Sequence, residues 1–256
     1  MNPGQQADQH NGRDREPTHD HDDDPYNPIL LDVFNTEVWI KLSDDVKPAR
    51  AYDASGRRSQ AQANRRVVLT AAREMFIERG YAKVTIAAVA KAAGVSPETI
   101  YKTIGPKPAL LKAVSDVAIA GDDEPLALEA REYIQQTIAE PDPVIKVDRY
   151  ATLIATTQPR FAPITQLVRQ AAMTDPDAAE VWATMKAERL TGAARFIAHL
   201  HENGLLRKDI TVEAARDLVW TYNSPEIYEL LVLGRDWPLD DFRDFISKAL
   251  IAALLP

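Results

Sequence analysis

A short polar segment, residues 92–103 (AAGVSPETIYKT), carries the side chains best suited to recognition chemistry at a surface. Its outward-facing residues are expected to be Ser96, Pro97, Glu98, Thr99, Lys102 and Thr103. Hydroxyl, carboxylate and ammonium groups hydrogen-bond to base edges and phosphates, while Val95 and Ile100 are the apolar residues expected to anchor the segment. The segment therefore predicts nucleic-acid recognition, although Ser96 is also explained as a helix cap.

Three other groups of polar residues have simpler interpretations. Residues 19–24 (HDHDDD) contain metal-ligating types, but nothing nearby fixes a geometry, so we expect a solvated acidic tail. No acidic pattern orients His199 and His201, which are predicted to be solvated at a helix end. The acidic pairs 122–123 and 240–241 lie at expected helix starts, where capping explains them. We therefore expect no metal, no cofactor and no catalytic residue, and a protein that is not an enzyme.

Composition limits the classes to which the chain can belong. It has 256 residues, 45% of them hydrophobic, which is enough for one large or two modest domains with a real core. It has no cysteine, so disulfides and thiolate chemistry are excluded. It contains neither a membrane-spanning apolar run nor the apolar core of a signal peptide, so we expect a cytoplasmic protein with no membrane partner.

Charge is distributed unevenly along the chain. The formal net charge is −8, yet residues 50–112 contain twelve Lys and Arg against four Asp and Glu, a local balance of +8. Residues 1–49 carry −7 and residues 113–256 carry −9. A basic block in an acidic protein indicates a phosphate-binding face, although a solvated helix surface explains the charge equally well.

Two segments precede the first long helix. Residues 1–28 carry too few apolar side chains to offset the entropy of ordering, so they are predicted to be a disordered acidic tail. Residues 29–56 begin with a more apolar stretch and are expected to form an N-terminal extension or arm.

Helical texture dominates from about residue 60, and no alternating run long enough for a sheet appears. We therefore predict an all-α protein. A three-helix helix-turn-helix domain is expected over 57–106, followed by a helical domain over 107–256 that begins with a connecting helix, 107–120. Proline-bearing breaks divide the rest into helices at 126–139, 143–158, 161–173, 177–202, 211–222, 224–233 and 239–254.

Residues 65–112 resemble the DNA-binding domain of TetR-family transcriptional regulators. The resemblance rests on AAREMFIERGY in the first helix, TIAAVAKAAGVS across the second helix and its turn, and TIYKTIGPKPALL leading into the fourth helix. These motifs cover nearly fifty residues in the family's order. Beyond them the resemblance rests on size and helical content, which suit a TetR effector-binding and dimerisation domain.

The resemblance implies contacts to double-stranded DNA. It implies phosphate contacts by Thr85, Tyr101 and Lys107. It places at the recognition surface Ser96, Pro97, Glu98, Thr99, Lys102 and Thr103. It also implies contacts to phosphates or the minor groove from Arg57, Arg58, Arg65 and Arg66. Tyr101 is alternatively a packing residue, and Lys107 a surface lysine.

The sequence departs from the family pattern in two places. The family often has His-Phe where this chain has Thr103 and Ile104, so the operator preference is expected to differ. The arm before the first helix is also far longer than usual. It is either a regulatory tail or a consequence of where the start codon was placed, and the residues leave both open.

The second domain is expected to house a small effector between its helices, as the resemblance implies. The residues expected near that pocket are Tyr150, Phe161, Met173, Trp182 and Met185. The last helices carry more apolar surface than a terminal pair needs, which predicts a homodimer interface. The residues expected there are Leu218, Ile227, Leu231, Phe242, Phe245, Ile246 and Leu250.

Taken together, these features predict a ligand-responsive transcriptional regulator, a repressor released from a palindromic operator by its effector. An activator, or a DNA-binding regulator without an effector, fits the same residues. A helical enzyme is less favoured because no catalytic constellation is found, and a protein-interaction module leaves the recognition surface unexplained.

Overall fold

A computed structural model describes residues 54–256, apart from the side chains at positions 54, 55, 57 and 58. The expected tail (1–28), nearly all of the expected arm (29–56) and the side chains of Arg57 and Arg58 therefore lie outside the described residues.

The described elements are all helical, which confirms the all-α prediction for residues 54–256. In chain order they are α1 (Ala54–Arg79), α2 (Ile86–Ala93), α3 (Pro97–Thr103), α4 (Lys107–Ala120), the 3-10 turn η1 (Leu128–Ala130), α5 (Glu132–Ala139), α6 (Pro143–Ala171), α7 (Pro176–Glu202), α8 (Val212–Tyr222), α9 (Pro225–Tyr228), the π-helical turn η2 (Glu229–Leu233) and α10 (Leu239–Leu254). Within this part of the chain, no helix is long and apolar enough to cross a membrane.

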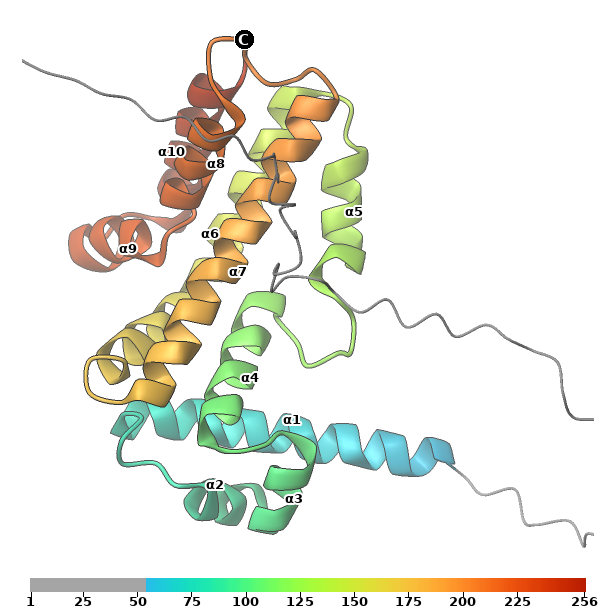
Figure 1. Cartoon of the computed structure of the whole chain (residues 1–256), viewed down its shortest axis with the longest axis vertical. Coiled ribbons are helices and arrows are strands. Elements are labelled where there is room, and N and C mark those ends of the chain that lie inside the picture. The colour runs from blue at the N-terminus through green and yellow to red at the C-terminus, as the bar shows by residue number, and fades with distance from the viewer. Residues whose placement is uncertain (1–53) are drawn as a thin grey trace, which may run out of the picture. The chain divides into compact units, whose positions relative to one another are not determined.

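The helices form two neighbouring groups that share α6 and α7. Figure 1 shows α1 lying across the lower ends of α4, α6 and α7, with α2 and α3 beneath it. One apolar core is shared by helices α1, α2, α3 and α4 and by the adjoining ends of α6 and α7, and it includes Phe76, Ile100 and Leu110. A second core joins the other ends of α6 and α7 to α8, α9 and α10. The long helix pair thus connects the segment expected to bind DNA with the rest of the molecule.

The helix break predicted near residues 159–160 is wrong. The sequence predicted separate helices at 143–158 and 161–173, but one helix runs through Pro159 and Pro163. A proline inside a helix removes a backbone hydrogen bond and costs about 3 kcal/mol. Twelve buried residues lie along α6, on both sides of the prolines, so tertiary packing outweighs that local cost.

The segment 126–139 is also interrupted, where the sequence predicted one helix. Arg131 adopts an extended backbone (φ −73°, ψ 140°) between η1 and α5. Its guanidinium pairs with both carboxylate oxygens of Asp122, at 2.6 and 2.8 Å, and only 7% of the residue is exposed. The break thus coincides with a buried arginine held by a carboxylate nine residues earlier, which no local pattern reveals.

Three residues expected at a dimer interface are instead internal. Phe242, Ile246 and Leu250 have no exposed surface, because this face of α10 packs on α6 and α8 within the same chain. They are corrected to core residues. Leu218, Ile227, Leu231 and Phe245 remain partly exposed. The large apolar residues of this region that are most exposed are Leu230 (68%) and Leu233 (52%), both in η2.

His199 is not the solvated residue that its position near a helix end suggested. Its Nε2 lies 2.7 Å from Nζ of Lys146, whose ammonium also donates to the carbonyl of Ile138 at 2.8 Å. Lys146 is 3% exposed. Burial and the Lys146 charge both lower the pKa of His199, so the neutral ring that accepts from the ammonium is the favoured form.

This contact predicts a loss of stability on mild acidification. Because the folded pKa of His199 lies below its usual 6.5, the unfolded chain binds the proton more readily, and stability falls as pH drops through 6.5. Melting temperatures measured between pH 8 and pH 5.5 should show this fall. His199→Gln, which keeps an acceptor but does not titrate, should show a shallower one. Parallel pH profiles for the two proteins would contradict the assignment.

Candidate nucleic-acid interface

The turn between α2 and α3 is built from residues whose roles the sequence predicts. Thr85 caps α2, its hydroxyl oxygen accepting from the amide of Ala88 at 3.1 Å. Gly94 ends α2 in the left-handed region (φ 68°), which favours glycine, and the amide of Val95 then donates to Ala90 at 3.0 Å. Helix α3 therefore begins at Pro97, directly after this turn.

Helix α3 is short and uses most of its hydroxyls internally. The Ser96 hydroxyl accepts from the Thr99 amide at 3.1 Å and lies 2.9 Å from the Thr99 hydroxyl. Thr103 donates its hydroxyl hydrogen to the carbonyl of Thr99 at 2.7 Å. The capping explanation of Ser96 is thus observed, and three of the six residues expected to face DNA also stabilise the helix.

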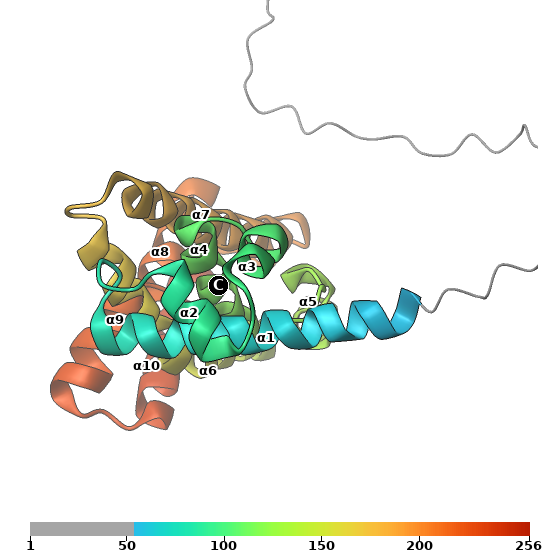
Figure 2. The same ribbon diagram turned by 90° about the horizontal axis from the view of Figure 1, so that it is seen from below.

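Four side chains on α3 point outward with no such engagement. Pro97, Glu98, Tyr101 and Lys102 are exposed, Tyr101 by 56%, and none makes a side-chain hydrogen bond or ion pair within residues 54–256. The opposite side of α3 is anchored by Ile100, which has no exposed surface. Viewed from below, α2 and α3 lie beside α1 at this end of the molecule (Figure 2). The arrangement presents a short helix whose outer face is free to contact a partner.

Lys107, expected to contact a phosphate, is held by the protein itself. Its ammonium lies 4.0 Å from the centroid of the Tyr81 ring and donates to the carbonyl of Ala82 at 3.4 Å. Burial lowers the pKa of Lys107, an effect that Asp175 partly opposes. Burial, with Asp175 and Asp177 nearby, raises the pKa of Tyr81 to about 12. The lysine therefore ties the start of α4 to the turn after α1.

Lys107→Ala tests whether that ammonium also meets DNA. We expect weaker binding to all DNA sequences alike and a fall of about 1 in the slope of log affinity against log salt. Fluorescence anisotropy titrations from low to physiological salt measure both quantities. Lys248→Ala, an exposed lysine on α10, is the matched control and should leave the slope unchanged. A weaker but equally salt-dependent Lys107→Ala protein would assign Lys107 to positioning only.

Arg65 likewise makes an internal contact rather than standing free. Its Nε donates to Asp123 at 2.9 Å, and its Nη1 lies 3.5 Å from the carbonyl of Thr103, the last residue of α3. The adjacent Asp122 pairs with Arg131, whose hydrogen bonds lower the pKa of Asp122 to about 2. The two neighbouring carboxylates after α4 thus hold one arginine of α1 and one that precedes α5. Arg66 is exposed on α1.

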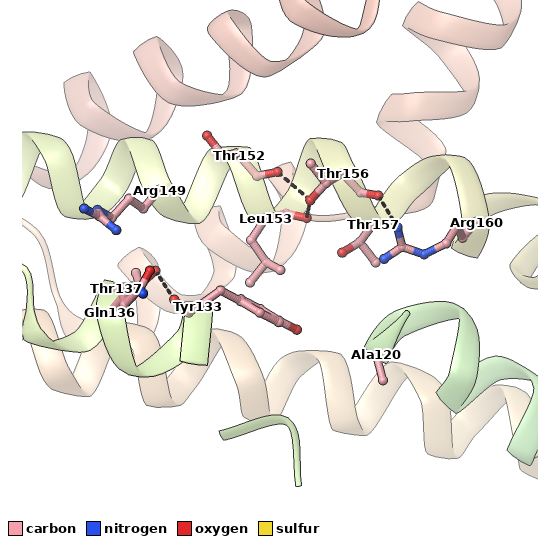
Figure 3. Close-up of a pocket in the computed structure, with 10 residues that line it drawn as sticks. All are labelled: Ala120, Tyr133, Gln136, Thr137, Arg149, Thr152, Leu153, Thr156, Thr157 and Arg160. Carbon is pink, nitrogen blue, oxygen red and sulfur yellow. Dashed lines mark hydrogen bonds between the residues drawn. The ribbon is translucent and has the colours of Figure 1, made fainter. Parts of the chain in front are cut away.

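A groove with a cavity volume of about 270 Å³ lies between α5, α6 and the end of α4 (Figure 3). It is lined by Ala120, Tyr133, Gln136, Thr137, Arg149, Thr152, Leu153, Thr156, Thr157 and Arg160. At one end Arg149 lies 3.4 Å from Glu140. At the other end Arg160 donates through Nε to the carbonyl of Ala118 at 3.3 Å and through Nη1 to that of Thr156 at 3.0 Å. The groove therefore abuts the helix that leads to the DNA-binding segment.

The residues expected to line an effector pocket lie elsewhere. Phe161 and Met185 belong to the first apolar core and Trp182 packs against it, while Met173, two residues after the end of α6, is 82% exposed. Tyr150 stacks on Phe196 with ring centroids 4.1 Å apart, and burial raises its pKa to about 12. None of the five lines the groove.

The groove residues on α6 form a sequence pattern that a search for aromatic residues alone misses. Arg149, Thr152, Leu153, Thr156, Thr157 and Arg160 follow the spacing of one helix face. They form a polar stripe rich in threonine, with an arginine at each end, on a mostly exposed face of α6. The predicted break at residues 159–160 hid it, because it assigned Arg160 to no helix.

Comparison with known proteins supports the resemblance of the N-terminal segment. Residues 68–114 match the family model of bacterial regulatory proteins of the tetR family. This span begins in α1 and ends in α4, so it contains α2, α3 and the turn between them. No curated protein matches the sequence significantly.

Solved structures share the fold over most of the chain at low sequence identity. A TetR-family regulator from Syntrophomonas wolfei is 16% identical, with a TM-score of 0.60 over 75% of this chain and 97% of that one. The fatty acid degradation regulator FadR from Bacillus halodurans is 17% identical, with a TM-score of 0.55 over 73% and 94%. SmeT in complex with triclosan is also 17% identical, with a TM-score of 0.58 over 76% and 93%.

The matched segment and the shared fold both include the geometry described above. The matched span contains the capped α2, the Gly94 turn and the outward face of α3, and the shared fold extends through the helices that follow. Residues 68–114 therefore match the DNA-binding segment of the tetR family of bacterial regulatory proteins, and the helices that follow share the fold of solved TetR-family regulators.

Proposed function

We propose that the protein is a homodimeric repressor that leaves a palindromic operator when a small molecule binds its C-terminal domain. The observation that supports the operator contact is the exposed face of α3, with Pro97, Glu98, Tyr101 and Lys102 projecting from a helix anchored by Ile100. In a two-fold dimer, two such helices would lie about 34–36 Å apart, or a multiple of this, and read two half-sites.

The same proposal gives the groove between α5 and α6 the effector role. SmeT is known in complex with triclosan, so a fold of this kind accommodates a small molecule. In this chain the groove contacts the end of α4 through Arg160 and Ala118. A ligand that favours a dimer with a different spacing of the two α3 helices would lower DNA affinity by linkage.

Selection of binding sites from genomic DNA, followed by gel shift, tests the proposal. We expect a palindromic site whose half-sites are about one helical turn apart, centre to centre, or a multiple of it. Transcription in vitro from a promoter carrying that site should fall when the protein is added. No shift of any genomic fragment at low salt would overturn DNA binding, and increased transcription would replace repression by activation.

A further inference from the structure

Arg160 is a solvent-exposed cation of the groove that has no acidic partner among the described residues. Of the ten lining residues two are arginines and none is acidic. Arg149 lies beside Glu140, whereas Arg160 makes no ion pair within residues 54–256. A groove with an uncompensated guanidinium favours a negatively charged occupant.

The hydrogen bonds of Arg160 leave one edge of its guanidinium available. An arginine has five N–H donors, one on Nε and two on each Nη. Here Nε donates to Ala118 and Nη1 donates once to Thr156, and no other hydrogen bond of this side chain occurs among the described residues. One donor of Nη1 and both donors of Nη2 therefore make no hydrogen bond within this part of the chain, and Nη2 lies beside Gly121, where an added Cβ would be 3.5 Å from it. The edge formed by the two Nη atoms matches the two oxygens of a carboxylate.

The remaining walls suit a small organic body next to that charge. Figure 3 shows the Tyr133 side chain extending along the groove between α5 and α6, with Leu153 above it and Ala120 near Arg160. A cavity of about 270 Å³ lies just below the range of about 300–1,000 Å³ for ligand pockets, so only a small ring compound or a short chain fits it. A single available guanidinium suits a monoanion better than a phosphate dianion.

We propose that the groove binds a small organic carboxylate, which pairs with Arg160 and rests its apolar body against Tyr133 and Leu153. The inference rests on the proposed function, because it names the chemical class of the effector. It also gives a route to DNA. Arg160 bonds to the carbonyl of Ala118, a buried residue at the end of α4, so a carboxylate that reorients the guanidinium alters a contact between α6 and α4.

Matched pairs of compounds test the ligand class. Benzoate, 1-naphthoate and hexanoate are each compared with their primary amides, and with inorganic phosphate at equal ionic strength, by thermal shift and calorimetry on the full chain. At least one carboxylate should bind with a Kd of about 1 mM or below, and its amide at least about tenfold more weakly. The inference is overturned if amide or phosphate binds equally well, or if no carboxylate binds at about 20 mM.

Two arginine variants test the location. Arg160→Gln should weaken binding of the carboxylate at least about tenfold, whereas Arg149→Gln, at the other end of the groove, should change it less than about threefold. The reverse order, or no effect of either change, would contradict the assignment. Gel shifts with the unsubstituted protein are read separately. If it shifts DNA but binds no carboxylate, only this inference fails, and if it shifts no DNA, the proposed function fails.

Discussion

Replacing Ile100 by alanine is expected to lower the free energy of unfolding by about 2–5 kcal/mol and the affinity for DNA at least about tenfold. Ile100 is the one buried residue of α3, and it has no exposed surface. Truncation removes its apolar contacts and leaves a cavity against α1 and α2. A seven-residue helix cannot hold its own geometry in water, so its position depends on this anchor.

Ile77→Ala is the matched control for this prediction. Ile77 lies on α1 in the same domain but is 44% exposed, so the same truncation should cost less than about 1 kcal/mol and leave DNA binding nearly unchanged. Urea denaturation and fluorescence anisotropy on both variants make the comparison. Equal losses of DNA affinity in the two proteins would show that α3 does not depend on Ile100.

Replacing both Leu230 and Leu233 by glutamate is expected to convert the protein to a monomer and to weaken operator binding more than about 100-fold. The two leucines are 68% and 52% exposed in η2, where Leu231 is partly exposed, and the partly exposed Ile227 lies in the preceding helix α9. Two carboxylates placed in an apolar interface would be desolvated without partners. A monomer would also engage one half-site at a time.

Sedimentation velocity across micromolar concentrations, with DNA titration, tests this second prediction. Leu126→Glu is the control, since Leu126 is 46% exposed in the segment between α4 and η1, outside α9, η2 and α10. It should leave the oligomeric state unchanged. A double variant that remains dimeric would show that Leu230 and Leu233 do not form the homodimer interface. A wild-type chain that is monomeric at these concentrations would contradict the homodimer itself.

The local features of the DNA-binding segment could be predicted because each depends on neighbouring residues. Thr85 and Ser96 cap helices through contacts three residues away, and Gly94 takes the left-handed conformation that its type permits. The exposed face of α3 follows from the same few positions. Such short-range requirements are visible in sequence as residue types at fixed offsets.

The features that could not be predicted depend on long-range contacts. Arg65 meets Asp123 across 58 positions and Lys146 meets His199 across 53, and no periodicity encodes either pair. Local propensity predicts a helix break at the prolines of α6, but packing against neighbouring helices keeps α6 continuous through Pro159 and Pro163. Which apolar face of α10 turns inward is likewise a property of the assembled bundle.

The adjacent carboxylates Asp122 and Asp123 have a consequence for modularity. One binds Arg131 ahead of α5 and the other binds Arg65 of α1, so two residues of a single turn hold partners on either side of α4 in the sequence. A chimera that joins the DNA-binding segment of this chain to the C-terminal region of another regulator should keep both Arg65 and Asp123, because they form an ion pair. A junction placed between α4 and this turn would separate that pair, whereas one placed after residue 131 would keep both ion pairs within the donor segment.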